Sequence, residues 1–264
     1  MPKSIPNDGE ETAVASEAAV NPASGLIGGH ALVISPLVGI ALSVVAALVI
    51  WGVLESILPV FELSERLREL SGNAPEEQQR ERMEASIAAA SNNATLSMAM
   101  LAATIALFLA AAEAKFRRAG LRMMWGGVLA AGVAAGFAVG AGILRGELDA
   151  SSAMPEDPLT ETIVLQTIAW GITGLGIGLG VALGVSLPNV SSKLLGTCLF
   201  GGLLGGALGG LIYPLASSVL LPNARTEVSM PDPGLSLFLW LGLGAVIIAL
   251  TVTGMGREKK KAEA

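Results

Sequence analysis

Two neighbouring stretches of the chain decide its fold. Residues 163–187 read IVLQTIAWGITGLGIGLGVALGVSL, and residues 194–221 read LLGTCLFGGLLGGALGGLIYPLASSVLL. Neither contains a charged side chain, and each is longer than the ~20 residues with which an α-helix crosses the ~30 Å hydrocarbon core of a bilayer. Because lipid offers no partner to backbone N–H and C=O groups, a helix is the expected form. The short connection at 188–193 predicts a tight antiparallel hairpin.

Four more apolar stretches complete a set of about six predicted spans, and none shows the alternation of a barrel strand. The six are residues 31–54, 94–112, 123–144, 163–187, 194–221 and 235–255. The composition agrees, since 52% of the residues are hydrophobic and only 14% are charged, against ~25% charged in a soluble domain. We therefore predict an all-α membrane protein in which 94–112 and 123–144 form a further hairpin.

The segments outside the spans are predicted to be tails and one helical loop. Residues 1–28 are polar, acidic and rich in Ala, Ser and Pro, which is typical of a disordered tail. Residues 257–264 are expected to form a short basic tail. Residues 55–93 are expected to form an extracytoplasmic helical loop, in which the leucines of 61–70 recur at helical spacing and predict a short amphipathic helix.

Pro75 marks the predicted start of a long helix, because proline is favoured at the first position of a helix. From Glu76 the chain reads EEQQRERMEASIAAASNNA without a helix breaker, and Arg80 can pair with Glu76 and with Glu84 at i,i+4 spacing. We predict one helix that begins outside the membrane and continues into the second span. It is either a docking stalk or a solvated extension of that span.

The distribution of basic residues predicts the orientation, because Lys and Arg near short loops favour the cytoplasmic side. With six spans, the basic residues of the 113–122 loop, the 188–193 loop and the C-terminal tail fall on one side. These are Lys115, Arg117, Arg118, Arg122, Lys193, Arg257, Lys259, Lys260 and Lys261, whereas the opposite short loops hold only Arg145 and Arg225. Both termini are therefore expected in the cytoplasm, with the protein in a bacterial inner membrane.

Glycines repeat every four residues within three of the spans, and residues at this spacing share one helical face. Such ladders let two helix backbones approach closely, which drives helix association in lipid. We expect them to form the core of the helix bundle; a pore lining or gating seam, and homo-oligomer packing through the second ladder of 194–221, are the alternatives. The glycines are Gly132, Gly136, Gly140, Gly176, Gly180, Gly184, Gly201, Gly202, Gly205, Gly206, Gly209 and Gly210.

The two hairpins match each other at an offset of 70 residues. Gly132, Gly136 and Gly140 then coincide with Gly202, Gly206 and Gly210, and three alanines coincide with the glycines of 176–184. Both hairpins enter the membrane from the same side. The offset therefore predicts a duplicated helical hairpin with a pseudo-two-fold axis along the membrane normal.

Residues that could support chemistry are scarce. The single histidine, His30, is expected at the membrane interface, and the single cysteine, Cys198, is expected to be a buried packing residue. Glu55 and Glu113 end the first and second spans, where solvation at the boundary is the expected role. No nucleophile with a base, no metal site and no cofactor site is expected, so we predict a protein that is not an enzyme.

Polar residues at depth are mostly threonines, which are expected to hydrogen-bond to their own helix. Gln166 lies near the outer end of its span, and no ionisable residue is expected near the centre of a span, as ion-coupled transport usually requires. The glycine-rich hairpin Trp170–Tyr213 resembles hairpins of uncharacterised bacterial polytopic membrane proteins, some of which resemble accessory parts of signalling or regulatory proteins. The resemblance implies a bacterial cytoplasmic membrane and no particular activity.

The first functional hypothesis is therefore a non-enzymatic interaction protein: a scaffold, an assembly factor or a regulatory subunit. Its expected partners are the lipid bilayer and either another membrane protein or a second copy, and no nucleic acid. The alternative is a small channel or transporter that passes a neutral or lipid-like solute between the two hairpins.

Overall fold

The computed structural model describes residues 31–70, 74–117, 122–149, 157–187, 191–221 and 230–256, and within these ranges the protein consists of helices without a β-strand. The helices are α1 (Pro36–Ile57), α2 (Glu65–Arg68), α3 (Glu76–Phe116), α4 (Arg122–Asp149), α5 (Pro158–Ser186), α6 (Ser192–Leu220) and α7 (Leu235–Gly256). All except α2 are long and apolar enough to cross a membrane. The prediction of an all-α membrane protein with six spans is confirmed.

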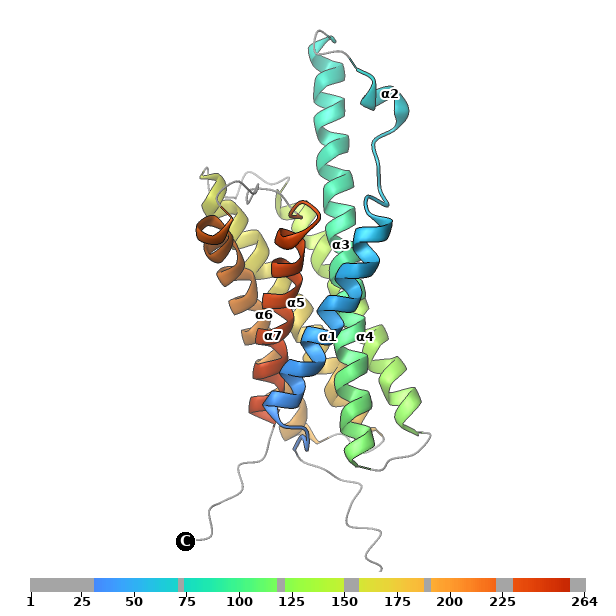
Figure 1. Cartoon of the computed structure of the whole chain (residues 1–264), viewed down its shortest axis with the longest axis vertical. Helices are drawn as coiled ribbons and strands as arrows, with labels where there is room; N and C mark the ends of the chain where they lie inside the picture. The colour runs from blue at the N-terminus through green and yellow to red at the C-terminus, as the bar shows by residue number, and fades with distance from the viewer. Residues whose placement is uncertain are drawn as a thin grey trace, which may run out of the picture.

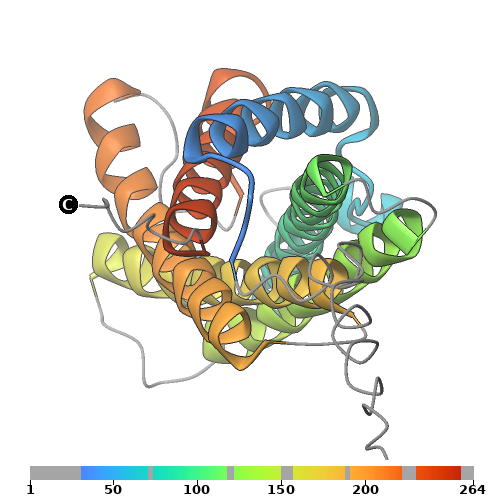
Figure 2. The same ribbon diagram turned by 90° about the horizontal axis from the view of Figure 1, so that it is seen from below.

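The six long helices form one bundle in which each packs on its neighbours in the order α1, α3, α4, α5, α6, α7, and α7 packs back on α1. Figure 2 shows this order from below. The two predicted hairpins are present as α3–α4 and α5–α6. Helix α5 also packs against α3, and it is the most buried of the six spans.

The first span differs from its prediction at its start. Residues 31–35 are not helical, and α1 begins at Pro36 rather than at residue 31. Pro36 disfavours a helical conformation at Ser35, and the Ser35 hydroxyl caps the new helix by accepting a hydrogen bond from the Val38 amide. Four apolar residues, 31–34, and Ser35 thereby become a non-helical segment before the first span.

The prediction of one long helix from Glu76 is confirmed, since α3 runs without interruption from Glu76 to Phe116. Its first turns project beyond the other helices as a stalk, residues 76–92, with α2 beside them (Figure 1). The predicted amphipathic helix of 61–70 is reduced to the single turn of α2, which buries Leu67. Arg80 pairs with Glu84 at 2.9 Å, whereas Arg66 of α2 pairs with Glu81 of the stalk.

Helices α5 and α6 begin at side-chain caps. Asp157 accepts a hydrogen bond from the Thr160 hydroxyl and another from the Thr160 amide, which together lower the pKa of Asp157 below its usual value. Ser191 accepts from the Leu194 amide at the start of α6. The predicted tails, 1–28 and 257–264, lie outside the described residues, as does His30.

Gly234 turns the chain into α7 with a φ of +101°. Its N–H donates to the Glu55 carboxylate at the end of α1, and its carbonyl accepts from the Trp51 indole at 3.1 Å. An L-residue with a Cβ is strained at this φ, so glycine serves both the turn and the contact with α1.

We predict that Gly234→Ala destabilises the protein by about 1 kcal/mol, because open space surrounds the position and the backbone alone resists the new Cβ. Gly52→Ala is the matched control: Gly52 is also surrounded by open space but lies within α1. Unfolding by sodium dodecyl sulfate, followed by circular dichroism, measures both. Equal midpoints for the two variants would contradict the expected strain.

Candidate functional site

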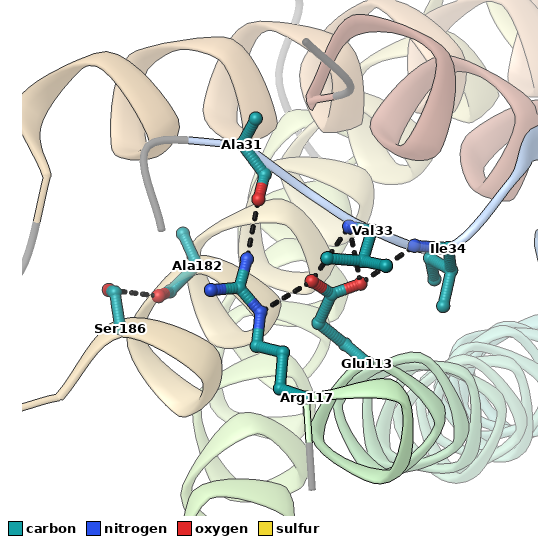
Figure 3. A network of polar contacts seen from close by, with 7 residues as sticks. All are labelled: Ala31, Val33, Ile34, Glu113, Arg117, Ala182 and Ser186. Atoms are coloured by element: carbon teal, nitrogen blue, oxygen red, sulfur yellow. Dashed lines mark hydrogen bonds and ion pairs between the residues drawn. The ribbon is translucent and has the colours of Figure 1, made fainter. Parts of the chain in front are cut away.

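Glu113 of α3 holds the extended segment that precedes α1. Its side chain is 0% exposed. The Val33 amide donates to both carboxylate oxygens at 2.8 and 2.9 Å, and the Ile34 amide donates to one of them at 2.9 Å (Figure 3). The carboxylate thus satisfies two backbone donors that no helix or strand pairs.

Arg117, one turn further along α3, completes this network. Its Nε donates to Glu113 at 2.7 Å, and its guanidinium also donates to the Ala31 carbonyl (Figure 3). The Leu32 amide meanwhile donates to the carbonyl of Gly256 at the end of α7, at 2.6 Å. The segment before α1 is therefore fixed to α3 and α7 by its backbone, and the first and last described residues lie at the same end of the bundle.

The prediction that Glu113 is solvated at the membrane boundary is wrong. A buried carboxylate is tolerated here because Arg117 neutralises it and three further hydrogen bonds reach its oxygens. Glu55, by contrast, is exposed at its boundary as predicted.

Asn93, at the other end of the span, holds the segment that follows α1. Its side-chain oxygen accepts from the amides of Val60 and Phe61, each at 3.0 Å, and its side-chain nitrogen donates to the Phe61 carbonyl at 2.9 Å. Twenty residues separate Asn93 from Glu113, which is about 30 Å along a helix. Helix α3 therefore fixes both ends of α1 at a separation equal to the hydrocarbon thickness.

One face of α5 carries the ladder that packs on α4. A Cβ added at Gly180 would lie 2.4 Å from the carbonyl oxygen of Ala130, and one added at Gly184 would lie 2.4 Å from that of Gly126. An added Cβ at Gly176 would similarly lie 2.3 Å from the Cβ of Phe137. Only glycine allows these two helices to come so close.

The two ladders of α6 face different neighbours. Gly202, Gly206 and Gly210 face α5, where an added Cβ would lie 2.1, 2.0 and 2.4 Å from the carbonyl oxygens of Gly174, Trp170 and Gln166. Gly201, Gly205 and Gly209 face α7, where added Cβ atoms would meet Thr251 and Gly244 at 2.1 to 2.9 Å. Both ladders of α6 are therefore covered by helices of the same chain, so neither faces outward toward a second copy.

The ladder of α4 behaves differently from the others. Gly132, Gly136 and Gly140 are exposed, and a Cβ added at any of them would meet nothing within 4 Å. The expectation that they lie in the bundle core is wrong for the described chain, because α4 turns the buried residues Ala130, Ala134, Ala138 and Ala141 toward its neighbours instead. The glycine face of α4 points outward.

The helix bounds repeat at the same offset as the glycines. Helices α3 and α5 end at Phe116 and Ser186, and α4 and α6 begin at Arg122 and Ser192, so each pair differs by 70 residues. The packing is not symmetric, however. Helix α4 packs along α5, whereas the described residues of α3 and α6 do not meet. The predicted pseudo-two-fold axis, which would require equivalent contacts, is wrong.

A cavity of about 680 Å³ opens between the stalk of α3 and the end of α4. Its apolar wall includes Ile87, Val139 and Ile143, and glycine lines it at Gly142 and Gly146. Three carboxylates also line it, those of Glu84, Glu147 and Asp149. The sequence placed the stalk outside the membrane but gave no sign of this groove.

Inside the bundle, polar groups are mostly satisfied within single helices. The hydroxyls of Thr104, Thr173, Thr197, Thr251 and Thr253 each donate to a carbonyl of their own helix, as predicted. The prediction is wrong for Thr167, whose buried hydroxyl has no hydrogen-bond partner. Gln166 instead accepts from the Trp240 indole at 3.2 Å and so joins α5 to α7, where Trp170 and Trp240 stack edge to face. Cys198 is buried, and no metal-binding group of side chains occurs among the described residues.

Comparison with known proteins identifies no relative: no family model, curated protein or solved structure matches the chain.

We predict that Glu113→Ala destabilises the protein by about 3 kcal/mol, because it leaves the Arg117 guanidinium and the backbone amides of Val33 and Ile34 without their partner. Glu84→Ala, which removes the exposed partner of Arg80 in the same helix, should cost about 0.5 kcal/mol or less. Dodecyl sulfate unfolding monitored by tryptophan fluorescence compares the two. Similar losses for both variants would contradict a structural role for the buried carboxylate.

We also predict that Gly206→Ala opens the α5–α6 contact, because the new Cβ would lie 2.0 Å from a backbone oxygen that cannot move alone. Gly136→Ala places the same methyl group in open space on α4 and should leave stability unchanged or improve it by about 1 kcal/mol. The unfolding midpoints of the two variants in detergent test this contrast, which fails if the midpoints agree.

Proposed function

We propose that this chain is a non-enzymatic, multi-pass protein of a bacterial cytoplasmic membrane that acts by binding another membrane protein, as a scaffold, an assembly factor or a regulatory subunit. The observation that carries the proposal is the stalk of α3. It exposes Met83 and Ile87, with exposed fractions of 61% and 49%, beyond the other helices. An apolar pair raised above the membrane on a helix is a typical site for a protein contact.

The position of α2 supports this assignment. The pairing of Arg66 with Glu81 and the bond from Arg82 to the Leu70 carbonyl, at 3.2 Å, hold α2 along the stalk. The stalk is therefore braced, which lowers the entropy lost on binding. A solvated extension of the span would need neither the brace nor the exposed apolar side chains.

The alternative, a channel or transporter between the hairpins, is less well supported. Helices α4 and α5 meet there through backbone: a Cβ added at Gly126 would lie 2.1 Å from the Gly184 carbonyl oxygen. A solute cannot pass between backbones at this distance unless the helices separate. The matching bounds of the two hairpins support an internal duplication that became asymmetric, rather than two halves around a pore.

We also propose the orientation with both termini in the cytoplasm, supported by the short basic loops at the end where Ala31 and Gly256 lie. The Glu113–Arg117 network then faces the cytoplasm, and the stalk projects to the other side.

A photo-crosslinking amino acid at Met83 tests the function in native membranes. Phe200 of α6 is the matched control, since it has a similar exposed fraction, 60% against 61%, on a membrane-spanning helix. We expect one discrete protein adduct from position 83 and none from position 200. Recovery of the chain alone from both variants, together with solute flux in proteoliposomes of the purified protein, would replace the interaction hypothesis with the transport alternative.

A further inference from the structure

We infer that the outward face of α4 (Val128, Gly132, Gly136, Gly140 and Ile143) docks a transmembrane helix of a different protein, whose end on the stalk side carries Lys or Arg. The inference rests on the proposed interaction function and specifies the partner. Every residue of this face is exposed, and its three glycines have nothing within 4 Å of an added Cβ.

The glycine ladder is the first reason for a helix as the occupant. Wherever else the described chain repeats glycine at this spacing, a neighbouring helix packs against the glycines. Helix α4 packs against Gly180 and Gly184, and α5 packs against Gly202 and Gly206. Gly132 and Gly136 sit at the positions that match Gly202 and Gly206 at the 70-residue offset. In lipid an apolar surface gains little from burial, so close approach over small residues is what favours one helix over lipid chains.

The groove at the stalk end of α4 supplies the second reason. The groove adjoins the outward face, because Ile143 belongs to that face and also lines the groove together with Val139. Its volume of about 680 Å³ can hold side chains from the end of a docked helix. Glu84, Glu147 and Asp149 line it without any Lys or Arg in the lining. Arg80 pairs with Glu84, and Arg145 lies buried one turn before Asp149, so an excess of negative charge remains.

Charge selects the partner. A basic residue at the end of an incoming helix would meet carboxylates at the membrane boundary, where partial desolvation strengthens the attraction. A second copy docked through the same face in the same orientation would instead bring the exposed Glu147 toward its own counterpart. Like charges brought together in this way disfavour a symmetric pair, which favours a different chain as the partner.

The test uses the full-length chain in phosphatidylcholine vesicles and two synthetic single-span peptides. Both peptides carry a Gly-xxx-Gly-xxx-Gly face on a leucine-rich helix; one ends in three lysines and the other in three glutamates. Energy transfer from a donor on the chain to an acceptor on the peptide measures binding. We expect the lysine peptide to bind about ten-fold more tightly than the glutamate peptide.

Two variants locate the binding. Gly136→Ile should weaken the lysine peptide about ten-fold, and Glu147→Lys should reverse the preference between the peptides. Gly52→Ile is the matched control, because Gly52 also has nothing within 4 Å but lies on α1; it should change affinity less than about two-fold. Circular dichroism and detergent unfolding check that the variants keep their fold.

Three results would overturn the inference. If both peptides bind with equal affinity, and Gly136→Ile and Gly52→Ile change that affinity equally, the outward face of α4 is not a docking site. Energy transfer between labelled copies of the chain that Gly136→Ile abolishes makes a second copy the occupant. Binding of neither peptide, with native mass spectrometry detecting a retained lipid that Gly136→Ile releases, makes lipid the occupant. An adduct at Met83 in any of these cases would leave the proposed interaction function standing and assign it to another surface.

Discussion

Helix α3 forms hydrogen bonds to the backbone at both ends of α1, and the arrangement of the bundle depends on this constraint. Glu113 accepts hydrogen bonds from the backbone before α1, and Asn93 accepts hydrogen bonds from the backbone after it. These backbone groups lie where the chain enters and leaves the membrane, and no helix pairs them, so the side chains of α3 supply their partners. By supplying both partners, α3 fixes the depth of α1, and α1 in turn carries Glu55 and Trp51 to the start of α7.

Within the membrane, close backbone contact replaces hydrophobic burial as the source of cohesion. Helix α5 provides it on two sides, to α4 through Gly180 and Gly184 and to α6 through Gly174 and Gly178. This central position explains why α5 is the most buried span. It also explains why α5 carries Gln166, which forms a hydrogen bond to Trp240 of α7. The stalk and the outward face of α4, which lie outside this network, are left available for other molecules.

Much of this fold could be predicted from the sequence, because the determining signals are local. Six long stretches with few or no charged residues predict the six membrane-spanning helices, and Pro75 predicts the start of α3 at Glu76. The burial of Glu113 could not be predicted. Its partners are the backbone amides of Val33 and Ile34, and every residue except proline has such an amide, so the sequence does not mark these two. The glycines of α4 and α6 share one spacing, yet only the rotation of each helix about its axis decides which ladder is covered, and that rotation follows from tertiary packing.

The separation of Asn93 and Glu113 also bears on how the protein meets membranes of unequal thickness. A single-span helix can tilt to match a thin bilayer or straighten in a thick one. Helix α1 cannot do so independently, because both its ends are bonded to one continuous helix. The apolar belt on this side of the molecule thus has a set height, and the surrounding lipids must stretch or compress to fit it.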